Sequence, residues 1–460
     1  MNKSYDVVVI GSGPGGYVAA IRLAQLGKSA CIVEQGRERI GGVCLNEGCI
    51  PTKALINSAG IYDLVNESSS LGLDVKVSPP DMPRLLSCAL DNSSKLRSGI
   101  EFLFKKNKID VILGRASLAS NTIVQVEGQD LSAQNIIIAT GSRPKVLTGL
   151  EPDGIRVLTS SDVFKLKEVP KSLLVIGAGA IGIEFGSLFS SLGSKVTIVE
   201  ALKQVLPLED KDVALEVTKY LKKKGIEVLT ASLIEKLEKK PSGCSVSIKT
   251  ESGSLNREFE YCLLSIGRSA NIEGLGLEKC KVLTEKGFIK VNELYQTSVN
   301  NIYAVGDCIN TPMLAHIASA EAIVAAEAIA GKNPKALDYD NIPSAVYSEF
   351  QVARVGLTES SAREKGMDIV VGKLPFRACG KAVLLHKEEG FVKIVSDKNS
   401  RIIGVHIAGH LASELIHEFV LAKSANLSLR DIANTVHSHP TLSEIAQDAA
   451  KAVFDKPIHG

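Results

Sequence analysis

The sequence lacks several features that would assign the protein to a class at once. It has no low-complexity segment, and no apolar run approaches the roughly 20 residues that span a bilayer. Neither sign of charge dominates, since 53 Lys and Arg against 51 Asp and Glu give a formal net charge of +2. We therefore expect no membrane-spanning segment, and no nucleic acid or anionic membrane surface as a partner.

The N-terminus lacks the pattern of a secretory signal. Residues 1–16, MNKSYDVVVIGSGPGG, enter a predicted strand within a few residues, without an apolar h-region or a cleavage-type sequence. The nine cysteines are scattered singly apart from one pair, which argues for a reducing compartment. We expect a cytoplasmic protein, and the matrix of an organelle after removal of a transit peptide stays open.

The one close pair of cysteines lies in residues 41–53, GGVCLNEGCIPTK. A disulfide between Cys44 and Cys49 would close a very small ring and stabilise a fold by only about 2 kcal/mol in the chain-entropy model. A disulfide that opens and closes therefore suits this position better than a structural one. Pro51 fits the first turn of a helix, so Cys49 is expected near a helix N-terminus, where a thiolate is stabilised. Two buried, unpaired thiols are the alternative on spacing alone.

A glycine-rich turn follows the first predicted strand, YDVVVI at residues 5–10. The turn, GSGPGG, leads into a helix with apolar spacing that ends near Gly27, and the next strand ends at Glu34, 18 residues past the last glycine. A GxGxxG turn alone is weak evidence, but in this context it predicts a dinucleotide site. Its glycines let the backbone approach a pyrophosphate, and Glu34 suits a ribose diol. The candidate binding residues are Gly11, Gly13, Gly16 and Glu34.

The same arrangement recurs in the middle of the chain. The strand LLVI at 173–176 leads into GAGAIG, a helix and a strand that ends at Glu200, again 18 residues past the last glycine. Two such units indicate two different dinucleotides. Glu200 favours NAD over NADP, because a carboxylate suits a free 2′-hydroxyl whereas a 2′-phosphate favours arginine. The candidate binding residues are Gly177, Gly179, Gly182 and Glu200.

Other segments complete an α/β pattern. Residues 84–107 predict a helix, and a β-rich return follows with predicted strands at 111–120, 122–128 and 135–142. A later strand, NNIYAVGDC, ends at Asp307, an acid placed to hold a hydroxylated chain. A long alanine-rich helix follows it.

After Pro334 the pattern changes to the alternation of an antiparallel sheet. Helices are predicted over 412–426 and 427–436, and the predicted strands are VARVGLT, AVLLHK, FVKIVSD and RIIGVHIAG. The segment HSHPTLSE follows, in which His439 and Glu444 are close enough for a carboxylate to orient an imidazole.

Together these motifs resemble those of the FAD/NAD-linked disulfide oxidoreductases, the class I pyridine nucleotide-disulfide reductases. GGVCLNEGCIPTK is similar to the family's redox-disulfide stretch, GSGPGG, IIIATGS and YAVGDC to its FAD motifs, GAGAIGIEFG to its NAD motif and HSHPTLSE to its C-terminal motif. The resemblance implies an α/β fold of two Rossmann-like dinucleotide-binding domains, with the NAD domain inserted in the FAD domain, and a C-terminal α+β dimerisation domain. The implied domains are FAD-binding 1–145, NAD-binding 146–265, central 266–337 and dimerisation 338–460.

The resemblance also implies an activity. The chain is expected to be an enzyme that oxidises dihydrolipoamide to lipoamide through a Cys44–Cys49 redox disulfide and FAD, with NAD as hydride acceptor. Cys49 then faces the flavin, Cys44 exchanges with the dithiol, and His439 is the base that Glu444 orients. A reductase for glutathione or another thiol is the alternative enzyme, against which Glu200 speaks. A subunit that holds FAD without turnover is the alternative of another class.

The implied partners are a second copy of the chain, whose C-terminal motif completes the active site, and lipoyl-bearing proteins of 2-oxo acid dehydrogenase or glycine cleavage complexes. Lys53 is expected near the flavin and paired with Glu184, and Asp307 is expected to bind the ribityl chain. No metal is expected. The remaining cofactor-binding candidates are Thr140, Gly141, Gly267 and Ala315.

Three positions depart from the family's pattern. Val43 stands where threonine is common, and Glu47 replaces an apolar residue between the cysteines. Ala180 replaces a larger side chain beside the nicotinamide pocket.

Overall fold

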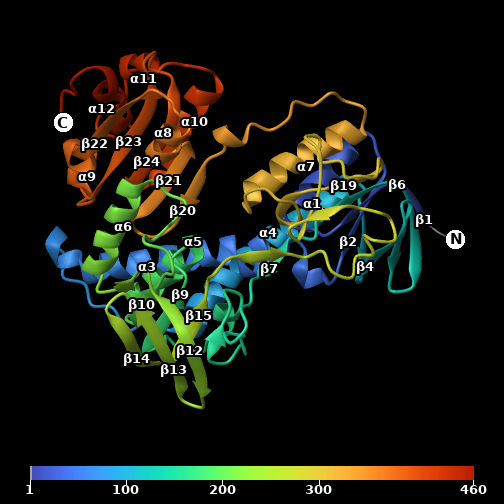
Figure 1. Ribbon diagram of the computed structural model, residues 1–460, viewed down its shortest axis with the longest axis horizontal. Coiled ribbons are helices and arrows are strands. Elements are labelled where there is room, and N and C mark those ends of the chain that lie inside the picture. The colour runs from blue at the N-terminus through green and yellow to red at the C-terminus, as the bar shows by residue number, and fades with distance from the viewer. Residues whose placement is uncertain (1–2, 460) are drawn as a thin grey trace. The chain divides into compact units, whose positions relative to one another are not determined.

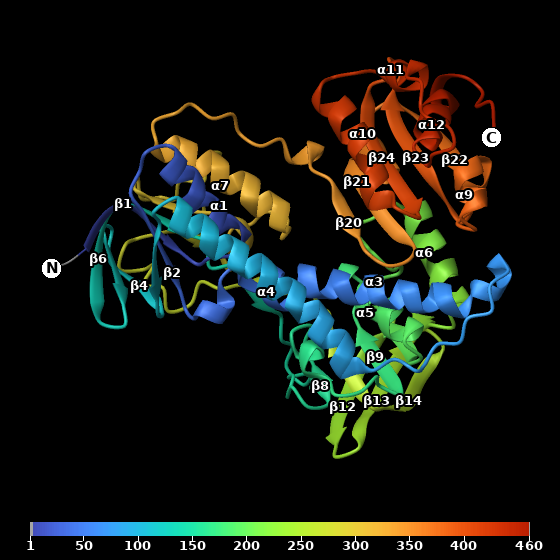
Figure 2. The ribbon, with the colours of Figure 1, turned by 180° about the vertical axis from the view of Figure 1, so that it is seen from behind.

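The computed structural model describes residues 3–459. The chain divides into two compact units (Figures 1 and 2). The first unit contains the residues up to Leu55 together with Pro83–Lys145 and Gly267–Leu337. The second unit contains Ile56–Met82, Val146–Ile266 and the residues from Asp338 onward.

A seven-stranded sheet forms the centre of the first unit, in the order β3-β2-β1-β6-β5-β4, with β19 also paired to β6. Strand β1 lies parallel to β2 and to β6, so the first predicted strand is central. Helix α1 packs on β1 and β2, and α7 packs beside α1. The strands and helices of this unit are β1 (Lys3–Ile10), α1 (Pro14–Gln25), β2 (Ala30–Glu34), α2 (Gly42–Glu47), α3 (Cys49–Asn66, whose second half belongs to the other unit), α4 (Met82–Lys106), β3 (Asp110–Leu113), β4 (Ala116–Ser120), β5 (Ile123–Val126), β6 (Gln129–Ile138), β7 (Ser142–Pro144), β16 (Arg268–Ala270), β17 (Thr284–Glu285), β18 (Phe288–Ile289), β19 (Ile302–Ala304) and α7 (Ala315–Ile329).

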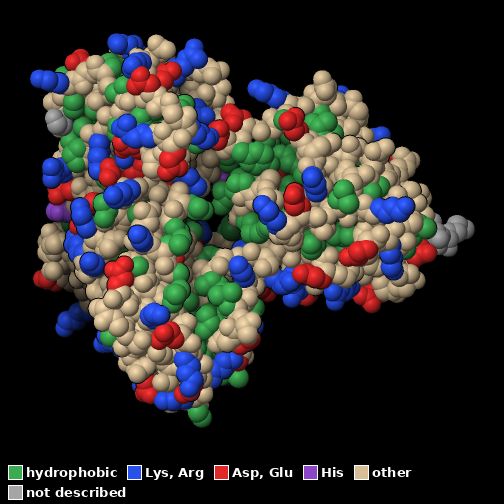
Figure 3. Space-filling view, in the orientation of Figure 1, with side chains coloured by type: hydrophobic (Ala, Val, Ile, Leu, Met, Phe, Trp, Pro, Cys, Tyr) green, Lys and Arg blue, Asp and Glu red, His purple; other side chains and the backbone are tan. Residues whose placement is uncertain are grey.

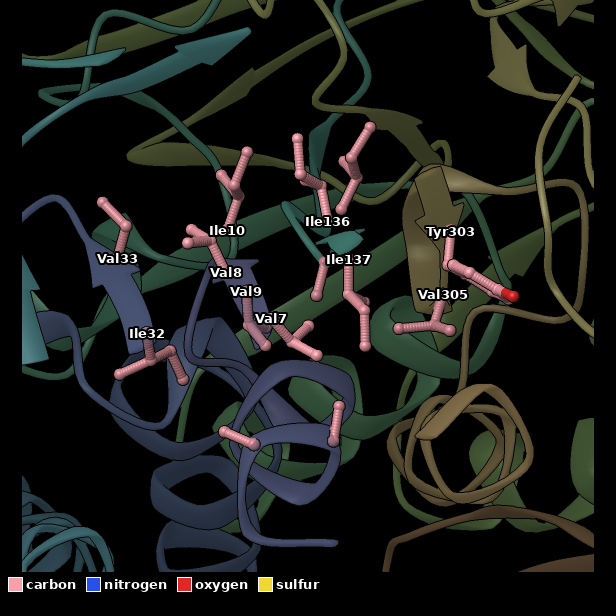
Figure 4. Close-up of a cluster of buried hydrophobic side chains, with 14 of the residues drawn as sticks. Val7, Val8, Val9, Ile10, Ile32, Val33, Ile136, Ile137, Tyr303 and Val305 are labelled. Carbon is pink, nitrogen blue, oxygen red and sulfur yellow. The ribbon is translucent and has the colours of Figure 1, made fainter. Parts of the chain in front are cut away.

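The core of this sheet is apolar on both faces. Figure 4 shows Val7, Val9 and Ile137 pointing to the face where helices lie, and Ile10 and Ile136 pointing to the other. All five side chains are buried. A parallel strand covered on both faces carries an unbroken apolar run, which is why YDVVVI was readable from the sequence.

The second unit contains a five-stranded parallel sheet in the order β11-β10-β9-β15-β8. Next to it in sequence is a three-stranded antiparallel sheet, β12-β13-β14. The strands and helices here are β8 (Val157–Leu158), β9 (Ser172–Ile176), α5 (Ala180–Ser191), β10 (Lys195–Val199), α6 (Lys211–Lys223), β11 (Glu227–Leu229), β12 (Leu233–Lys240), β13 (Gly243–Thr250), β14 (Gly253–Phe259) and β15 (Tyr261–Leu264).

The C-terminal part of the second unit contains an antiparallel sheet in the order β20-β21-β24-β23-β22. Helix α10 packs on β21 and β24, and α12 packs on β22 and β23.

On the face of the molecule shown in Figure 3, side chains of both charge signs are interspersed. The elements are β20 (Ser344–Val346), β21 (Gln351–Gly356), α8 (Glu359–Glu364), β22 (Ile369–Pro375), α9 (Gly380–Leu384), β23 (Gly390–Asp397), β24 (Ile402–Gly409), α10 (Ala412–Ser424), α11 (Leu429–Asn434) and α12 (Glu444–Phe454).

One predicted strand is wrong. AVLLHK at 382–387 begins inside the short helix α9 and continues as a turn. Leu384 is 64% exposed and Val383 45% exposed, so the apolar run does not cover a core. The strand that pairs with β23 is instead β22, which lies earlier in the chain and pairs along its whole length. An apolar run this short does not distinguish a strand from a helical turn.

The predicted strand over 111–120 is two strands. Gly114 adopts a φ of 144° between them, a conformation that favours glycine. Strand β3 continues the parallel sheet beside β2, whereas β4 pairs with β5 in the antiparallel sense. The sequence analysis also missed β20 and the C-terminal helix α12, which begins at Glu444.

Candidate functional site

The first glycine loop joins β1 to α1 and closes very tightly. A Cβ added at Gly16 would lie 1.9 Å from the carbonyl oxygen of Gly11, and Gly11 itself has a φ of 98°. Gly13 is the N-cap of α1, and no side chain caps this helix start in the described part of the chain. The backbone amides of the first turn can therefore bind an anion. The loop therefore fits a dinucleotide pyrophosphate.

Glu34 holds this loop from the end of β2. One carboxylate oxygen accepts hydrogen bonds from the Ser12 amide at 3.0 Å and the Ser12 hydroxyl at 2.7 Å, and the other accepts from the Gln35 amide at 2.7 Å. A carboxylate accepts about four hydrogen bonds in all. Glu34 thus orders the loop and retains acceptor capacity for a ribose.

The second glycine loop, between β9 and α5, repeats this arrangement in the other unit. A Cβ at Gly182 would lie 2.0 Å from the carbonyl oxygen of Gly177, and Gly179 is the N-cap of α5. Glu200, which is 8% exposed, accepts hydrogen bonds from the Ala178 amide at 2.7 Å and the Leu202 amide at 2.9 Å. The two predicted sites therefore share one local design.

The cysteine loop packs directly on the first glycine loop. The Gly41 amide donates to the Ser12 carbonyl at 3.1 Å, and a Cβ at Gly42 would lie 2.6 Å from the Cα of Gly13. Gly41, with a φ of 91°, precedes helix α2, which carries Cys44. The predicted redox stretch and the predicted dinucleotide site are thereby joined in the first unit.

Cys44 and Cys49 lie close together, near enough for Cys49 to act on the pKa of the Cys44 thiol, and both are free cysteines. Cys49 is the first residue of α3, as the position of Pro51 predicted. The neighbouring Cys49 thiol and burial raise the pKa of the Cys44 thiol, and the positive charge of Lys53, one turn along α3, opposes this shift. The spacing alone was also compatible with two buried, separate thiols. The closeness of Cys44 and Cys49 is what a redox pair requires.

Asp307 lies within a short polar network in the first unit. Its carboxylate accepts a hydrogen bond from the Ser142 hydroxyl, and the same hydroxyl accepts one from Nε of Arg268 at 2.7 Å. Nearby, the Thr140 hydroxyl donates to the carbonyl of Asn271 at 2.6 Å. Thr140 and Gly141 therefore border the network that contains Asp307.

Arg268 is a charged residue that the sequence analysis missed, although Gly267 before it was a candidate. Burial lowers its pKa, while the charges of Asp307 and Cys49 oppose that shift, so the guanidinium lies close enough to sense both groups. Arginine stays protonated in proteins. The network thus holds a fixed positive charge near the cysteine pair.

Ala315 is the first residue of α7 in the first unit. Gly306, just before Asp307, donates its amide to the buried carboxylate of Glu321 in the same helix at 2.6 Å. The start of α7 and the 3-10 turn Gly306–Cys308 are therefore connected through Glu321. Ala315 lies in this connected segment.

His439 and Glu444 form the predicted pair in the second unit. Nδ1 of His439 lies 2.9 Å from one oxygen of Glu444, and the Thr441 amide donates to the other at 2.8 Å. The Thr441 amide and then His439 hold the pKa of Glu444 below its usual range. The imidazole is 77% exposed, so its Nε2 is the nitrogen available for proton transfer.

His437, two residues earlier, was not singled out by the sequence analysis. Its side chain is 9% exposed, with Nδ1 3.0 Å from the Thr435 carbonyl and Nε2 3.1 Å from a carboxylate oxygen of Glu418. Both ring nitrogens thus meet acceptors on the protein. His437 fixes the segment on which His439 stands.

Glu184 is buried in α5 and accepts a hydrogen bond from the Tyr347 amide at 3.1 Å. It belongs to the second unit, whereas Lys53 belongs to the first. The pairing of Lys53 with Glu184 stays a prediction. The same division separates the cysteine pair and first glycine loop from the second glycine loop and His439.

Comparisons with known proteins identify the family. The family model described as pyridine nucleotide-disulphide oxidoreductase matches residues 5–322, and the dimerisation domain of that family matches residues 342–450. The chain therefore belongs to the pyridine nucleotide-disulphide oxidoreductases. The predicted family, the α/β fold class, and FAD and NAD(H) as the cofactors of an oxidoreductase are thereby confirmed.

Individual relatives cover the full chain. A dihydrolipoyl dehydrogenase of Bacillus subtilis is 41% identical over all of this chain and all of its own length. A dihydrolipoyl dehydrogenase of Geobacillus stearothermophilus is 43% identical over 99% of this chain and 97% of its own. Among solved structures, LpdA of Mycobacterium tuberculosis matches with a TM-score of 0.90 at 26% identity, covering 98% of this chain and 99% of its own.

A second solved structure is the HOCl-induced flavoprotein disulfide reductase RclA of Escherichia coli, with a TM-score of 0.87 at 28% identity. It covers 98% of this chain and 100% of its own. The match to the dimerisation domain supports a homodimer. Within residues 3–459, no helix is long and apolar enough to cross a membrane.

Proposed function

We propose that the chain is a dihydrolipoyl dehydrogenase, which oxidises the reduced lipoyl dithiol and uses NAD as hydride acceptor. One observation carries the proposal: Cys44 and Cys49 lie close together in a segment that packs against the first glycine loop. A dithiol-exchanging pair is thereby held beside a dinucleotide site. Relatives at 41% and 43% identity over the full chain, which carry this name, support the choice of substrate.

In the proposed mechanism, His439 of one subunit acts on the dithiol bound by the other. Its Nε2 takes a proton from a substrate thiol, because only a thiolate attacks a disulfide. Glu444, hydrogen-bonded to Nδ1, holds the ring in the required tautomer and stabilises the imidazolium that forms.

The cysteine pair then accepts the two electrons. The substrate thiolate attacks Sγ of Cys44, the Cys44–Cys49 bond breaks, and Cys49 leaves as a thiolate. The second substrate thiol attacks the mixed disulfide, which releases oxidised lipoamide and leaves both cysteines reduced. Arg268 and Lys53 lie close enough to stabilise negative charge on the pair.

The cofactors would be held by the two glycine loops. The first loop, Glu34 and Asp307 fit FAD, and the second loop with Glu200 fits NAD; Thr140, Gly141, Gly267 and Ala315 are proposed to line the FAD site. FAD supplies the electron relay between a dithiol and a nicotinamide. The four predicted domain ranges, with the NAD domain at 146–265, are retained as part of this proposal.

We place the enzyme in the cytoplasm as a homodimer. Its proposed partners are lipoyl-bearing proteins of 2-oxo acid dehydrogenase or glycine cleavage complexes. The full-length bacterial relatives named dihydrolipoyl dehydrogenase support this assignment.

A steady-state comparison tests the proposal. Dihydrolipoamide with NAD should give the highest kcat/KM, at least 100-fold above dihydrolipoamide with NADP. In the reverse direction, oxidised glutathione with NADH or NADPH should give negligible turnover. Preference for glutathione, or a yellow protein that turns over none of these substrates, would contradict the proposal.

Glu200 tests the nicotinamide assignment separately. Glu200→Gln keeps an acceptor for the Ala178 amide but loses the charge that favours a ribose diol. We expect the KM for NAD to rise about tenfold, which corresponds to about 1.4 kcal/mol, with reduction of the flavin by dihydrolipoamide unchanged. An unchanged KM for NAD would contradict the role of Glu200.

A further inference from the structure

One polar side chain lies between the two cysteines of the proposed redox pair. Asn46 belongs to α2 and stands between Cys44 and Cys49 in the sequence. Its Nδ2 donates hydrogen bonds to the carbonyl oxygens of Ile40 and Gly42, both at 2.9 Å. Asn46 therefore ties the residues that lead into α2 to the last turn of that helix.

Arg97 of α4 holds the same side chain from a distant part of the chain. Its Nη1 donates to Oδ1 of Asn46 at 3.0 Å and to the carbonyl oxygen of Glu38 at 2.9 Å. We call the hydrogen bonds made by Nη1 of Arg97 and Nδ2 of Asn46 the Asn46 network. All of its members belong to the first unit.

Apolar packing fixes α4 beside this segment. Ile100 and Phe104 of α4 belong to the same buried cluster as Ile40 and Leu45. Each of these four side chains is at most 9% exposed. Because this core holds α4 in place, Arg97 binds Asn46 from a fixed position.

Helix α2 depends on such contacts because it is short. It contains only Gly42–Glu47, and an isolated helix of this length is unstable in water. Gly48 follows it so closely that an added Cβ would lie 3.2 Å from the Cα of Cys44. The backbone positions of Cys44 and Cys49 therefore depend on how α2 is held.

We propose that Asn46 and Arg97 are positioning residues that set the redox equilibrium of the cysteine pair. This inference rests on the proposed function, in which Cys44 and Cys49 alternate between a disulfide and two thiols. A disulfide forms only within a narrow range of backbone geometry. The Asn46 network keeps the reduced segment in that geometry, so that closure costs little entropy and the disulfide is favoured.

The charge of Arg97 acts in the opposite direction from its hydrogen bonds. A nearby cation stabilises a thiolate and so favours the reduced pair. Loss of the charge alone makes the disulfide more stable, whereas loss of the hydrogen bonds makes it less stable. The direction of the change therefore separates the two effects.

A redox titration of the holoenzyme tests the inference. The protein is equilibrated with dithiothreitol buffers of graded oxidised-to-reduced ratio, quenched in acid, alkylated in denaturant and digested with trypsin without reductant. Cleavage after Arg39 and Lys53 gives one peptide that contains both cysteines. Its oxidised form carries no alkyl group and its reduced form carries two.

The exchange with dithiothreitol balances as a two-electron reaction. The two thiols of dithiothreitol become its cyclic disulfide, and two electrons and two protons reduce the protein disulfide to two thiols. In Arg97→Gln we expect half oxidation at an about tenfold higher ratio of oxidised to reduced dithiothreitol, which corresponds to about 30 mV. Asn46→Ala should change the ratio in the same direction.

Arg37 provides the matched control. Its guanidinium pairs with Glu101 of α4, with Nε 2.8 Å from a carboxylate oxygen, and it is not part of the Asn46 network. Arg37→Gln removes one positive charge, as Arg97→Gln does, but leaves Asn46 bonded. Its half-oxidation ratio should equal that of the unmodified chain or be lower.

A double-mutant cycle tests whether the two residues act together. The double variant Asn46→Ala, Arg97→Gln should change the ratio by less than the sum of the two single changes, because both remove the same contact. Arg97 is only partly buried, so Arg97→Gln decides the question where Asn46→Ala fails to fold.

Three results would overturn the inference: an unchanged or lower ratio in Arg97→Gln, an equal rise in Arg37→Gln, or additive changes in the double variant. A peptide of the unmodified protein that carries two alkyl groups at every ratio would overturn the proposed function as well. Normal oxidation of the unmodified protein with no change in the Arg97 variant refutes only the positioning role.

Discussion

At the scale of single residues, His439 is the part of the proposed mechanism that a single substitution tests most directly. His439 is exposed, and its Nδ1 is held by Glu444, whose other oxygen is tied to the Thr441 amide. His439→Gln keeps a polar side chain but removes the base. We expect kcat with dihydrolipoamide to fall about 10²–10⁴-fold, the usual contribution of a general base, as measured by NADH formation.

The same variant has a built-in control. NADH should still reduce the flavin of His439→Gln at the wild-type rate in stopped flow, because no dithiol takes part in that reaction. Glu444→Gln keeps the imidazole and should lose less activity than His439→Gln. Undiminished turnover of dihydrolipoamide by His439→Gln would rule out its assignment as the base.

Two buried groups in the second unit respond to pH in opposite directions. Burial lowers the pKa of His406 to about 4, and burial raises the pKa of Glu209 to about 7. Asp210, Arg354 and Lys393 are the charged groups that act on His406, and the first two also act on Glu209.

The direction of each effect follows from proton binding. Between about pH 6.5 and pH 4, the unfolded chain protonates His406 and the folded chain does not, so stability falls as the pH falls. Between about pH 4.5 and pH 7, the folded chain keeps a proton on Glu209 that the unfolded chain has lost. That contribution to stability falls as the pH rises, so the two effects partly cancel.

Single variants should separate them. Relative to the unmodified chain, the thermal midpoint of His406→Gln should rise as the pH is lowered from 6.5 to 4.5. That of Glu209→Gln should rise as the pH is raised from 4.5 to 7. Each group changes the free energy of unfolding by about 3 kcal/mol at most over its pH range. Parallel pH profiles for all three proteins, measured by differential scanning fluorimetry, would disprove both assignments.

At the scale of elements, the two glycine loops leave no room for a side chain at their closest points. Gly16 and Gly182 each approach a backbone carbonyl so closely that a methyl group would lie within 2.0 Å of it. Gly16→Ala should release FAD, seen as loss of the yellow colour on gel filtration. Gly182→Ala should keep FAD and raise the KM for NAD by at least 100-fold.

Gly179 is the matched control for Gly182, because no described atom lies within 4 Å of a Cβ added there. Gly179→Ala should leave the thermal midpoint of the cofactor-free protein unchanged, whereas Gly182→Ala should lower it by several degrees. Equal midpoints for the two variants would show that the carbonyl contact at Gly177 is unimportant.

At the scale of the whole molecule, the dimerisation domain is the feature to test. Large apolar side chains in and beside residues 342–450 are exposed in the single chain: Val436 is 91% exposed, Ile458 71% and Leu421 68%. Apolar exposure of this kind is usual where a second copy binds. Val436 is also close in sequence to His439, which fits a site shared between subunits.

Mixed dimers test the shared site. Cys44→Ser and His439→Gln should each be inactive as homodimers. Co-refolded in equal amounts, they should recover about a quarter of wild-type activity, because half of the dimers are hybrids and each hybrid keeps one intact site. If each subunit uses its own His439 and Cys44, no activity returns. Hybrid formation is checked by affinity tags on each variant.

The sequence by itself determined the local parts of this protein. The apolar run of β1, the tight glycine turns and the acids at the ends of β2 and β10 could be predicted because each depends on neighbours within one βαβ unit. The position of Cys49 at a helix start followed from Pro51 for the same reason. The motif order then identified the family, which the full-length comparisons confirm.

Only the tertiary structure decided which distant residues meet. Arg268 reaches Ser142 and Asp307 through the pairing of β16 with β7, which no local pattern encodes. The segment AVLLHK resembled a strand, yet β22 took the place beside β23. The physical reason is that burial and pairing are set by what covers a segment, and that partner lies elsewhere in the chain.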